Sequence, residues 1–200
     1  LGLLDTSHMR YKLAAPTGRA AKRMMETSKR HTSTVHRLLE FDASIMQFSK
    51  NEQNAIEADF IIIDEASMID IFLAHSIFKA VPENAHIVFI GDIDQLPSVG
   101  PGNVLLDMIK TDSIATTKLT EIFRQSQDSL IVHNAHKINN SQFPSNFEEG
   151  CKKDFYFIKE DNPEKAFDQI KMIIKEKFPQ HHISVDKSIV LVPMNRGSIG

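Results

Sequence analysis

Two carboxylates, Asp64 and Glu65, stand side by side directly after the apolar run of residues 60–63, in the stretch FIIIDEAS. In an open sheet of parallel strands, ligands bind beyond the carboxyl ends of the strands. Acids that meet there favour a hard cation, and Mg²⁺ in proteins takes one or two carboxylates together with phosphates and water. The pair therefore predicts a magnesium-dependent phosphate site, in which Asp64 holds the ion and Glu65 orients or deprotonates a water.

A plainer interpretation of the same stretch stays open. Successive side chains of a strand point to opposite faces, so the two acids need not meet. An Asp or Ser after a strand also often caps the next helix, and Ser67 is placed to do so. The stretch alone does not decide between a cap and a nucleotide site.

A second segment, FIGDIDQLPSVGPG at residues 89–102, favours the nucleotide site. Asp92 follows another apolar run, so it is expected at the same edge of the sheet. Gln95 comes three residues later, and its amide can donate to a phosphate oxygen or hold a water without adding charge. Most glutamines in loops are surface amides, but the acidic strand end nearby favours a role for this one.

The elements that must position these residues alternate between strands and helices. Short apolar runs predict strands at 10–15, 59–64, 86–92 and 113–119, and helical spacing with caps predicts helices at 16–29, 32–40, 68–81, 103–110 and 128–140. Residues 41–58 are polar and predict a loop. Strands that are apolar on both sides indicate an α/β fold with a mainly parallel sheet covered on both faces.

A polar stretch at 140–153 predicts a domain boundary, which gives a first domain at 1–140 and a second segment at 141–200. In the second segment, apolar runs predict strands at 154–159 and 187–193. A helix opening with Pro is expected between them, at 163–178. This strand–helix–strand pattern indicates the start of another α/β domain.

Bulk properties limit the class of protein. The 200 residues carry a formal charge of −3, with eight basic residues and one acid in 10–37, and eight acids and one lysine in 38–74. This segregation suits an anionic partner, or else two solvated faces of opposite sign. The single cysteine, Cys151, excludes an intrachain disulfide and a cysteine-based zinc site, and a reducing, cytoplasmic location is expected. No apolar run approaches the roughly 20 residues of a membrane helix.

Five stretches in this order, LAAPTGRAAKRM, TVHRLL, IIIDEASM, GDIDQLPSVGPG and LTEIFRQ, resemble the consecutive motifs of superfamily-1 DNA helicases of the RecD-like branch. The resemblance implies a RecA-like P-loop NTPase motor domain at 1–140. It also implies a linker and the beginning of a second RecA-like motor domain at 141–200. The implied activity is 5′–3′ translocation on single-stranded DNA driven by ATP and Mg²⁺, in DNA repair or recombination.

The resemblance also implies roles for single residues. Asp64 is the magnesium-associated acid, Glu65 the catalytic base, and Gln95 the sensor of the γ-phosphate, with Asp92 beside the nucleotide. Arg124 is the arginine that stabilises charge on the transferred phosphoryl group. From spacing alone, a salt bridge between Arg124 and Glu121 is the simpler interpretation.

DNA contacts are implied at Pro16, Thr17, Gly18 and Arg19, where a strand turns into a helix, and at His36 and Arg37. The N-terminus of a helix offers free N–H groups and a partial positive charge to phosphates, and glycine lets a backbone approach closely. The alternatives are a surface helix capped by Thr17 and a histidine that is simply packed.

One expected part is absent from the sequence. No G-x-x-x-x-G-K-[ST] phosphate loop occurs in residues 1–200. We therefore expect an N-terminally truncated fragment that alone hydrolyses ATP negligibly. Two other functions compete: a degenerate, non-hydrolysing DNA-binding subunit of a recombination nuclease complex, and a metal-dependent nuclease that uses Asp64, Glu65, Asp92 and Asp94.

Overall fold

The computed structural model describes residues 1–119 and 128–192. The chain divides into two compact units, Leu1–Leu119 and Thr120–Gly200, and each is described by itself. This division falls earlier than the boundary predicted after residue 140. The reason is that the helix α6 (Leu130–Asn139), predicted to close the first domain, bonds to the segment that follows it. Buried Asn134 donates to the carbonyl of Ser145 over 2.8 Å and accepts from its N–H over 2.8 Å.

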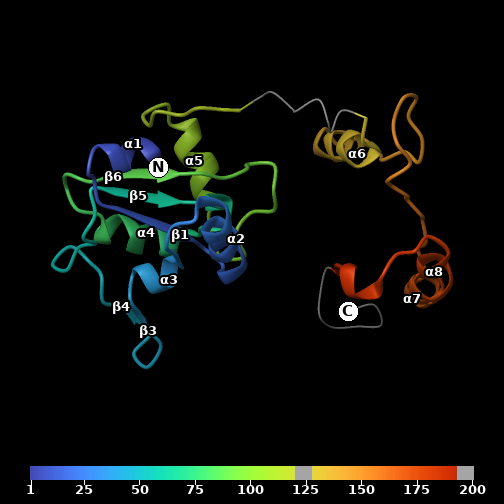
Figure 1. The fold of residues 1–200 in the computed structure, drawn as a ribbon, viewed down its shortest axis with the longest axis horizontal. Coiled ribbons are helices and arrows are strands. Elements are labelled where there is room, and N and C mark those ends of the chain that lie inside the picture. Colours follow the sequence, from blue (N-terminus) through green and yellow to red (C-terminus); the bar gives the residue numbers. More distant parts are fainter. Residues whose placement is uncertain (120–127, 193–200) are drawn as a thin grey trace. The chain divides into compact units, whose positions relative to one another are not determined.

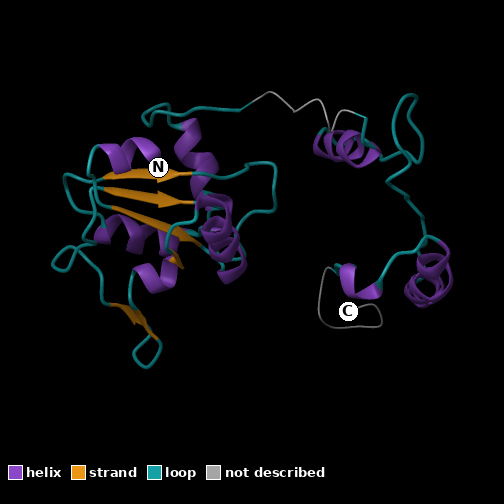
Figure 2. Cartoon of the chain, in the orientation of Figure 1, coloured by secondary structure: helices purple, strands orange, loops and turns teal. Residues whose placement is uncertain are grey.

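The first unit is built on a parallel sheet of order β2-β1-β5-β6 (Figures 1 and 2). The strands are β1 (Tyr11–Ala15), β2 (Thr32–Thr34), β5 (Phe60–Ile63) and β6 (His86–Phe89). The central strand β5 pairs with β1 on one side and with β6 on the other, with Ile63 opposite Ala14 and Phe89. The predicted parallel α/β sheet is confirmed, and its carboxyl ends meet at one edge.

Short helices flank the sheet. They are α1 (Gly2–Thr6), α2 (Gly18–Ser28), α3 (Val35–Leu38), the 3₁₀ turn η1 (Ala66–Met68), α4 (Ile71–Ala80) and α5 (Val104–Lys110). In Figure 1, α3 and α4 lie below the sheet, and α1 and α5 lie above it. Side-chain caps fix three of the starts: Thr17 accepts from Ala20 N, Thr34 from Arg37 N, and Asp70 from Leu73 N. Asp70, and not Ser67, therefore caps the helix after the acidic strand.

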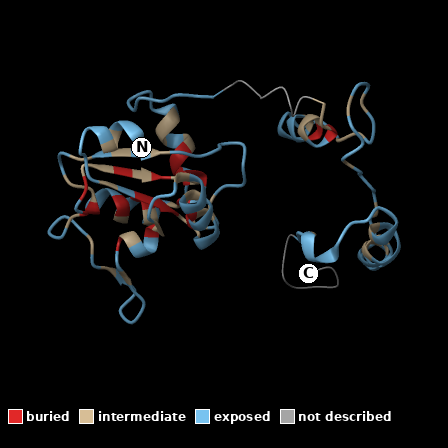
Figure 3. Ribbon diagram, in the orientation of Figure 1, coloured by how far each residue is buried: buried red, intermediate tan, exposed pale blue. Residues whose placement is uncertain are grey.

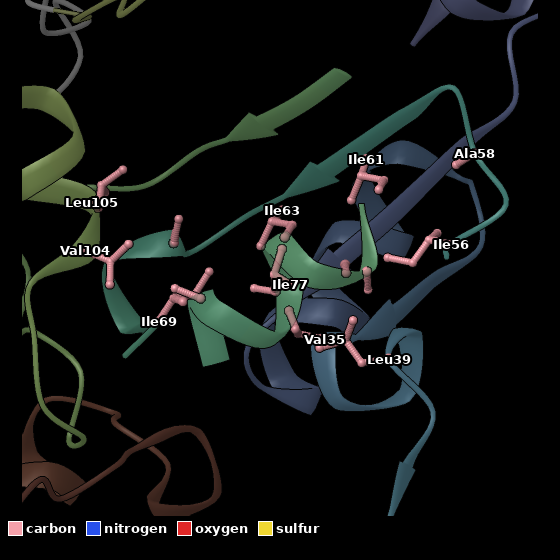
Figure 4. Packing of buried hydrophobic residues seen from close by; sticks show 14 residues of the cluster. Val35, Leu39, Ile56, Ala58, Ile61, Ile63, Ile69, Ile77, Val104 and Leu105 are labelled. Carbon is pink, nitrogen blue, oxygen red and sulfur yellow. The ribbon is translucent and has the colours of Figure 1, made fainter. Parts of the chain in front are cut away.

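The large buried cluster of the first unit lies mostly against the face of the sheet that α3 and α4 cover, and α5 contributes Val104 and Leu105 to it (Figures 3 and 4). Ile61 and Ile63 of β5 are fully buried with Ile77 of α4. Burying one such side chain contributes about 1.5–3 kcal/mol, so this cluster is the main source of stability. The opposite face is only partly covered, with Val88 40% exposed, because α1 and α5 are short.

The segment 41–58, predicted as a loop, contains a small hairpin of β3 (Phe41–Asp42) and β4 (Gln47–Phe48). Three predicted strands are wrong within the described residues: 113–119, 154–159 and 187–192 form none. Tyr156 and Ile189 in these runs are 72% and 68% exposed. An apolar run becomes a strand only where a neighbouring strand supplies hydrogen bonds and a surface to cover.

The helix predicted at 163–178 is confirmed. It begins as α7 (Pro163–Met172), capped by Asn162, and continues through the π-helical η3 (Ile173–Lys177) into α8 (Phe178–Gln180). The 3₁₀ turn η4 (Val185–Lys187) follows. Over residues 1–119 and 128–192, no helix is both long and apolar enough to cross a membrane.

Candidate active site

The two strand-end acids come together because the strand stops before them. Ile63 is the last residue of β5, and Asp64 N still donates to the Ala14 carbonyl over 2.9 Å. Glu65 then turns into the left-handed region, at φ 54° and ψ 40°, and its N–H donates to Asp64 Oδ1 over 2.9 Å. Since the strand alternation has ended, both half-buried carboxylates face the same cavity, which removes the objection that neighbouring strand residues point apart.

This cavity, of about 490 Å³, is lined by Asp64, Glu65, Gln95 and one face of α2. The helix contributes Ala20, Arg23, Met24, Thr27 and Ser28. Their spacing of three and four residues places them on a single side of the helix. The structure thus brings three of the sequence-predicted catalytic residues to one site.

Gln95 reaches the cavity from an exposed turn that Asp92 organises. Asp92 Oδ1 accepts from Asp94 N over 2.9 Å, and the Asp92 carbonyl accepts from Gln95 N over 3.3 Å. Neither Asp92 nor Asp94 is among the described residues that line the cavity. In this structure Asp92 shapes the turn that presents Gln95.

The α2 side of the cavity was not predicted from the sequence. Arg23 is exposed there, and its guanidinium makes no ion pair or hydrogen bond within the described residues. The Thr27 hydroxyl donates to the Arg23 carbonyl over 2.9 Å, and its residue lines the cavity one turn further on. The signal that would have found Arg23 and Thr27 is their helical spacing after the Pro16–Gly18 turn.

The predicted DNA-contacting turn lies at the start of α2. Thr17 caps the helix through its side chain, as the alternative interpretation required. Gly18 and Arg19 are exposed, and a Cβ placed on Gly18 would meet nothing within 4 Å. The cap and an open approach for a ligand therefore coexist at this turn.

His36 packs beside the small hairpin. Its ring lies 5.5 Å from that of Phe41 and 5.6 Å from that of Phe48, between ring centroids. His36 therefore packs against these two rings while remaining an exposed residue. Arg37 is exposed and donates its backbone N–H to the Thr34 hydroxyl.

Arg124 lies outside the described residues. Within residues 1–119 and 128–192, no group of three or more His, Cys, Asp or Glu side chains gathers as a metal site. Ser67, the predicted cap, is instead 7% exposed, and its hydroxyl has no hydrogen-bond partner in that part of the chain.

The chain is similar to several known proteins. A family model described as an AAA domain matches residues 2–101. The "ATP-dependent RecD2 DNA helicase" of Deinococcus radiodurans is 32% identical over 198 residues, which cover 99% of this chain and 26% of that protein. The "RecBCD enzyme subunit RecD" of Mycobacterium tuberculosis is 34% identical over 133 residues, covering 58% of this chain and 23% of that one.

Among solved structures, a Bacteroides Pif1 bound to ssDNA matches with a TM-score of 0.47 and 22% identity, covering 71% of this chain and 39% of that chain. The chain spans about a quarter of the length of the two curated relatives. The family model, in contrast, accounts for half of the chain. The chain belongs to the AAA domain family.

Proposed function

We propose that this chain is part of an ATP-dependent DNA helicase that moves 5′–3′ along single-stranded DNA in DNA repair or recombination, in the cytoplasm. The observation that carries the proposal is the shared cavity of Asp64, Glu65 and Gln95. The names of the two relatives, a DNA helicase and a subunit of the RecBCD enzyme, support it. Because the second relative is a subunit of the RecBCD enzyme, we also propose other subunits of a nuclease complex as partners.

The cavity fits a nucleotide with its magnesium ion. Two carboxylates at one end supply the hard oxygen ligands that Mg²⁺ prefers, and the ion takes its remaining ligands from phosphates and water. When bound, Mg²⁺ neutralises charge on the phosphates. Asp64 would hold the ion, Glu65 would accept a proton from the attacking water, and Gln95 would hydrogen-bond the γ-phosphate or that water.

Two arginines add positive charge to the proposed site. Arg23 faces the cavity without an ion pair in the described residues, so its guanidinium is free to contact a phosphate. Arg124 keeps the role that the resemblance implies, which is to stabilise charge on the transferred phosphoryl group. Asp92 keeps its implied place beside the nucleotide. Such an arginine raises the rate of phosphoryl transfer by about 10³- to 10⁵-fold.

The proposed DNA contact is the turn of Pro16, Thr17, Gly18 and Arg19 with the start of α2, together with His36 and Arg37. The open space at Gly18 and the exposed Arg19 support it. Backbone contacts of this kind give binding that depends on salt and hardly on sequence. For the domains, we propose a first motor domain at 1–140 and a linker with the start of a second at 141–200.

The test is Glu65→Gln in the full-length gene product. The amide keeps the shape but cannot take a proton, so nucleotide binding should persist while ATP hydrolysis falls by about 10²-fold or more. ATP affinity and steady-state hydrolysis with single-stranded DNA are measured for both proteins. Glu83→Gln, an exposed glutamate remote in sequence from the site, is the matched control.

Other outcomes would refute the proposal. If the wild-type protein binds single-stranded DNA but does not hydrolyse ATP, the chain is part of a degenerate, non-hydrolysing subunit. If it cleaves DNA with Mg²⁺ in the absence of ATP, it is a metal-dependent nuclease. The nuclease is the less favoured of these, because Asp92 and Asp94 are not among the described lining residues.

A further inference from the structure

The loop that carries Gln95 is hydrogen-bonded at both ends to the segment that directly follows the two acids. This segment, residues 66–71, joins Glu65 to α4. At the near end of the loop, Ala66 N donates to the Ile90 carbonyl over 2.8 Å. At the far end, Ile71 N donates to the Pro101 carbonyl over 2.9 Å. The donors of both hydrogen bonds, Ala66 and Ile71, lie within six residues of Glu65. Backbone hydrogen bonds therefore link the loop to the segment next to the acids.

Glycines allow the close approach at the near end. A Cβ on Gly91 would lie 2.8 Å from Leu105 Cδ2 and 3.0 Å from Ser67 N. A side chain at position 91 would therefore force the Leu105 side chain to move and would press against the backbone of residues 66 and 67.

The contact at the far end is tighter still. A Cβ on Gly100 would lie 2.0 Å from Asp70 Oδ2 and 2.8 Å from Asp70 Cβ. The Asp70 carboxylate cannot swing aside freely, because its Oδ1 caps α4 by accepting from Leu73 N over 2.8 Å. Ser98 supports the same turn, since its hydroxyl lies 2.9 Å from the Gly100 carbonyl oxygen.

We propose that Gly100 is a positioning residue: because it carries no side chain, the Gln95 loop packs directly against Asp70 and is held in the position that fixes Gln95 relative to Asp64 and Glu65. Gly100 does not line the cavity in the described part of the chain, so it would act through the loop and not by touching a nucleotide. The Asp70 side chain, which also caps α4, is the neighbour that a larger residue at position 100 would strike. The catalytic part of this inference rests on the proposed function, whereas the contact itself does not.

The contact is tested on the 200-residue chain with two variants. The first adds a side chain at position 100, and the second also removes the side chain at position 70. Gly100→Ala should raise the exchange rate of the Ile71 and Gln95 amide hydrogens about tenfold or more, because the clash breaks the hydrogen bond at the far end of the loop. The double variant Asp70→Gly/Gly100→Ala removes every Asp70 atom within 3 Å of the new methyl group and should return both rates to within about threefold of wild type. Gly2→Ala, where a Cβ meets nothing within 4 Å, is the control.

Three results would overturn the inference at this stage. The first is unchanged exchange at Ile71 and Gln95 in Gly100→Ala. The second is an equal rise at the buried core amides of Ile63 and Ile77, which indicates general unfolding. The third is failure of the double variant to restore the rates.

The positioning role is tested in the full-length gene product. Gly100→Ala should lower kcat for ATP hydrolysis about tenfold while KM for ATP stays within about threefold, and the double variant should recover kcat. An unchanged kcat, in a variant whose loop exchange has risen, overturns the positioning role. Absence of ATP hydrolysis in the wild type refutes the proposed function instead, and the exchange result still decides the contact.

Discussion

At the scale of single residues, Glu65 is held in a left-handed conformation that costs an ordinary side chain roughly 1–2 kcal/mol. Such a conformation persists where the surroundings over-determine it, and it is common at active sites. Here the bond from Glu65 N to Asp64 Oδ1 and the bond from Ala66 N to the Ile90 carbonyl fix the peptide groups on both sides. The strain is what turns the second carboxylate toward the cavity of the first.

Arg23 gives the prediction at this scale. Arg23→Ala in the full-length gene product should weaken ATP binding about tenfold, since one hydrogen bond to a charged group contributes roughly 1.5 kcal/mol. Fluorescence titration with a labelled ATP analogue measures the affinity. Lys22→Ala is the control, because Lys22 lies next to Arg23 but pairs with Glu26 on the outer face of α2 at 3.9 Å. Equal affinities in the two variants would show that Arg23 does not contact the nucleotide.

At the scale of elements, a single ion pair ties the starts of β1 and β5. Asp59 accepts from the Arg10 backbone N–H over 2.8 Å and from its guanidinium over 3.0 Å, while the Arg10 carbonyl accepts from Phe60 N. The hydrogen bonds from the Arg10 side chain, more than its charge, lower the pKa of the Asp59 carboxyl below its usual value. These contacts set the register in which Tyr11 stands opposite Phe60.

The lowered pKa predicts a pH dependence. Because the folded-state pKa of Asp59 is below the unfolded value of about 3.9, the pair stabilises the fold above about pH 4 and the effect is lost as the pH falls through the folded pKa. Melting temperatures of wild type and Asp59→Asn should differ at pH 6 and converge toward pH 3. Glu83→Gln serves as the control for a general acid effect. A difference that stays constant over this range would contradict the pairing.

At the scale of the whole molecule, the large hydrophobic cluster of the described residues lies in the first unit, while Leu130 is the fully buried apolar side chain described in the second. The buried cluster runs from Ala14 to Leu105, with partly buried neighbours as far as Ile109. The second unit is held differently, by polar contacts such as the Asn134–Ser145 pair and the ion pair of Lys152 with Asp128 at 2.7 Å. A buried cluster of this kind gives cooperative unfolding.

A chain that ends at Leu119 should therefore fold by itself. We expect a single cooperative transition whose melting temperature lies within about 5 °C of the main transition of the 200-residue chain, a shift worth about 1 kcal/mol at most. Calorimetry of both chains measures this. A shortened chain without a cooperative transition would show that the second unit is needed for the core.

The sequence by itself determined the local features of this protein: the apolar runs that become β1, β5 and β6, the cap at Thr17, and the candidate residues Asp64, Glu65 and Gln95. These follow from periodicity and from side-chain chemistry close along the chain. Only the tertiary structure decided which parts meet. It placed β5 between β1 and β6, turned Glu65 toward Asp64, brought Arg23 to the cavity, and left the run at 154–159 without a partner strand. The physical reason is that a strand or a site is completed by groups distant in sequence, whose arrival depends on packing over the whole unit.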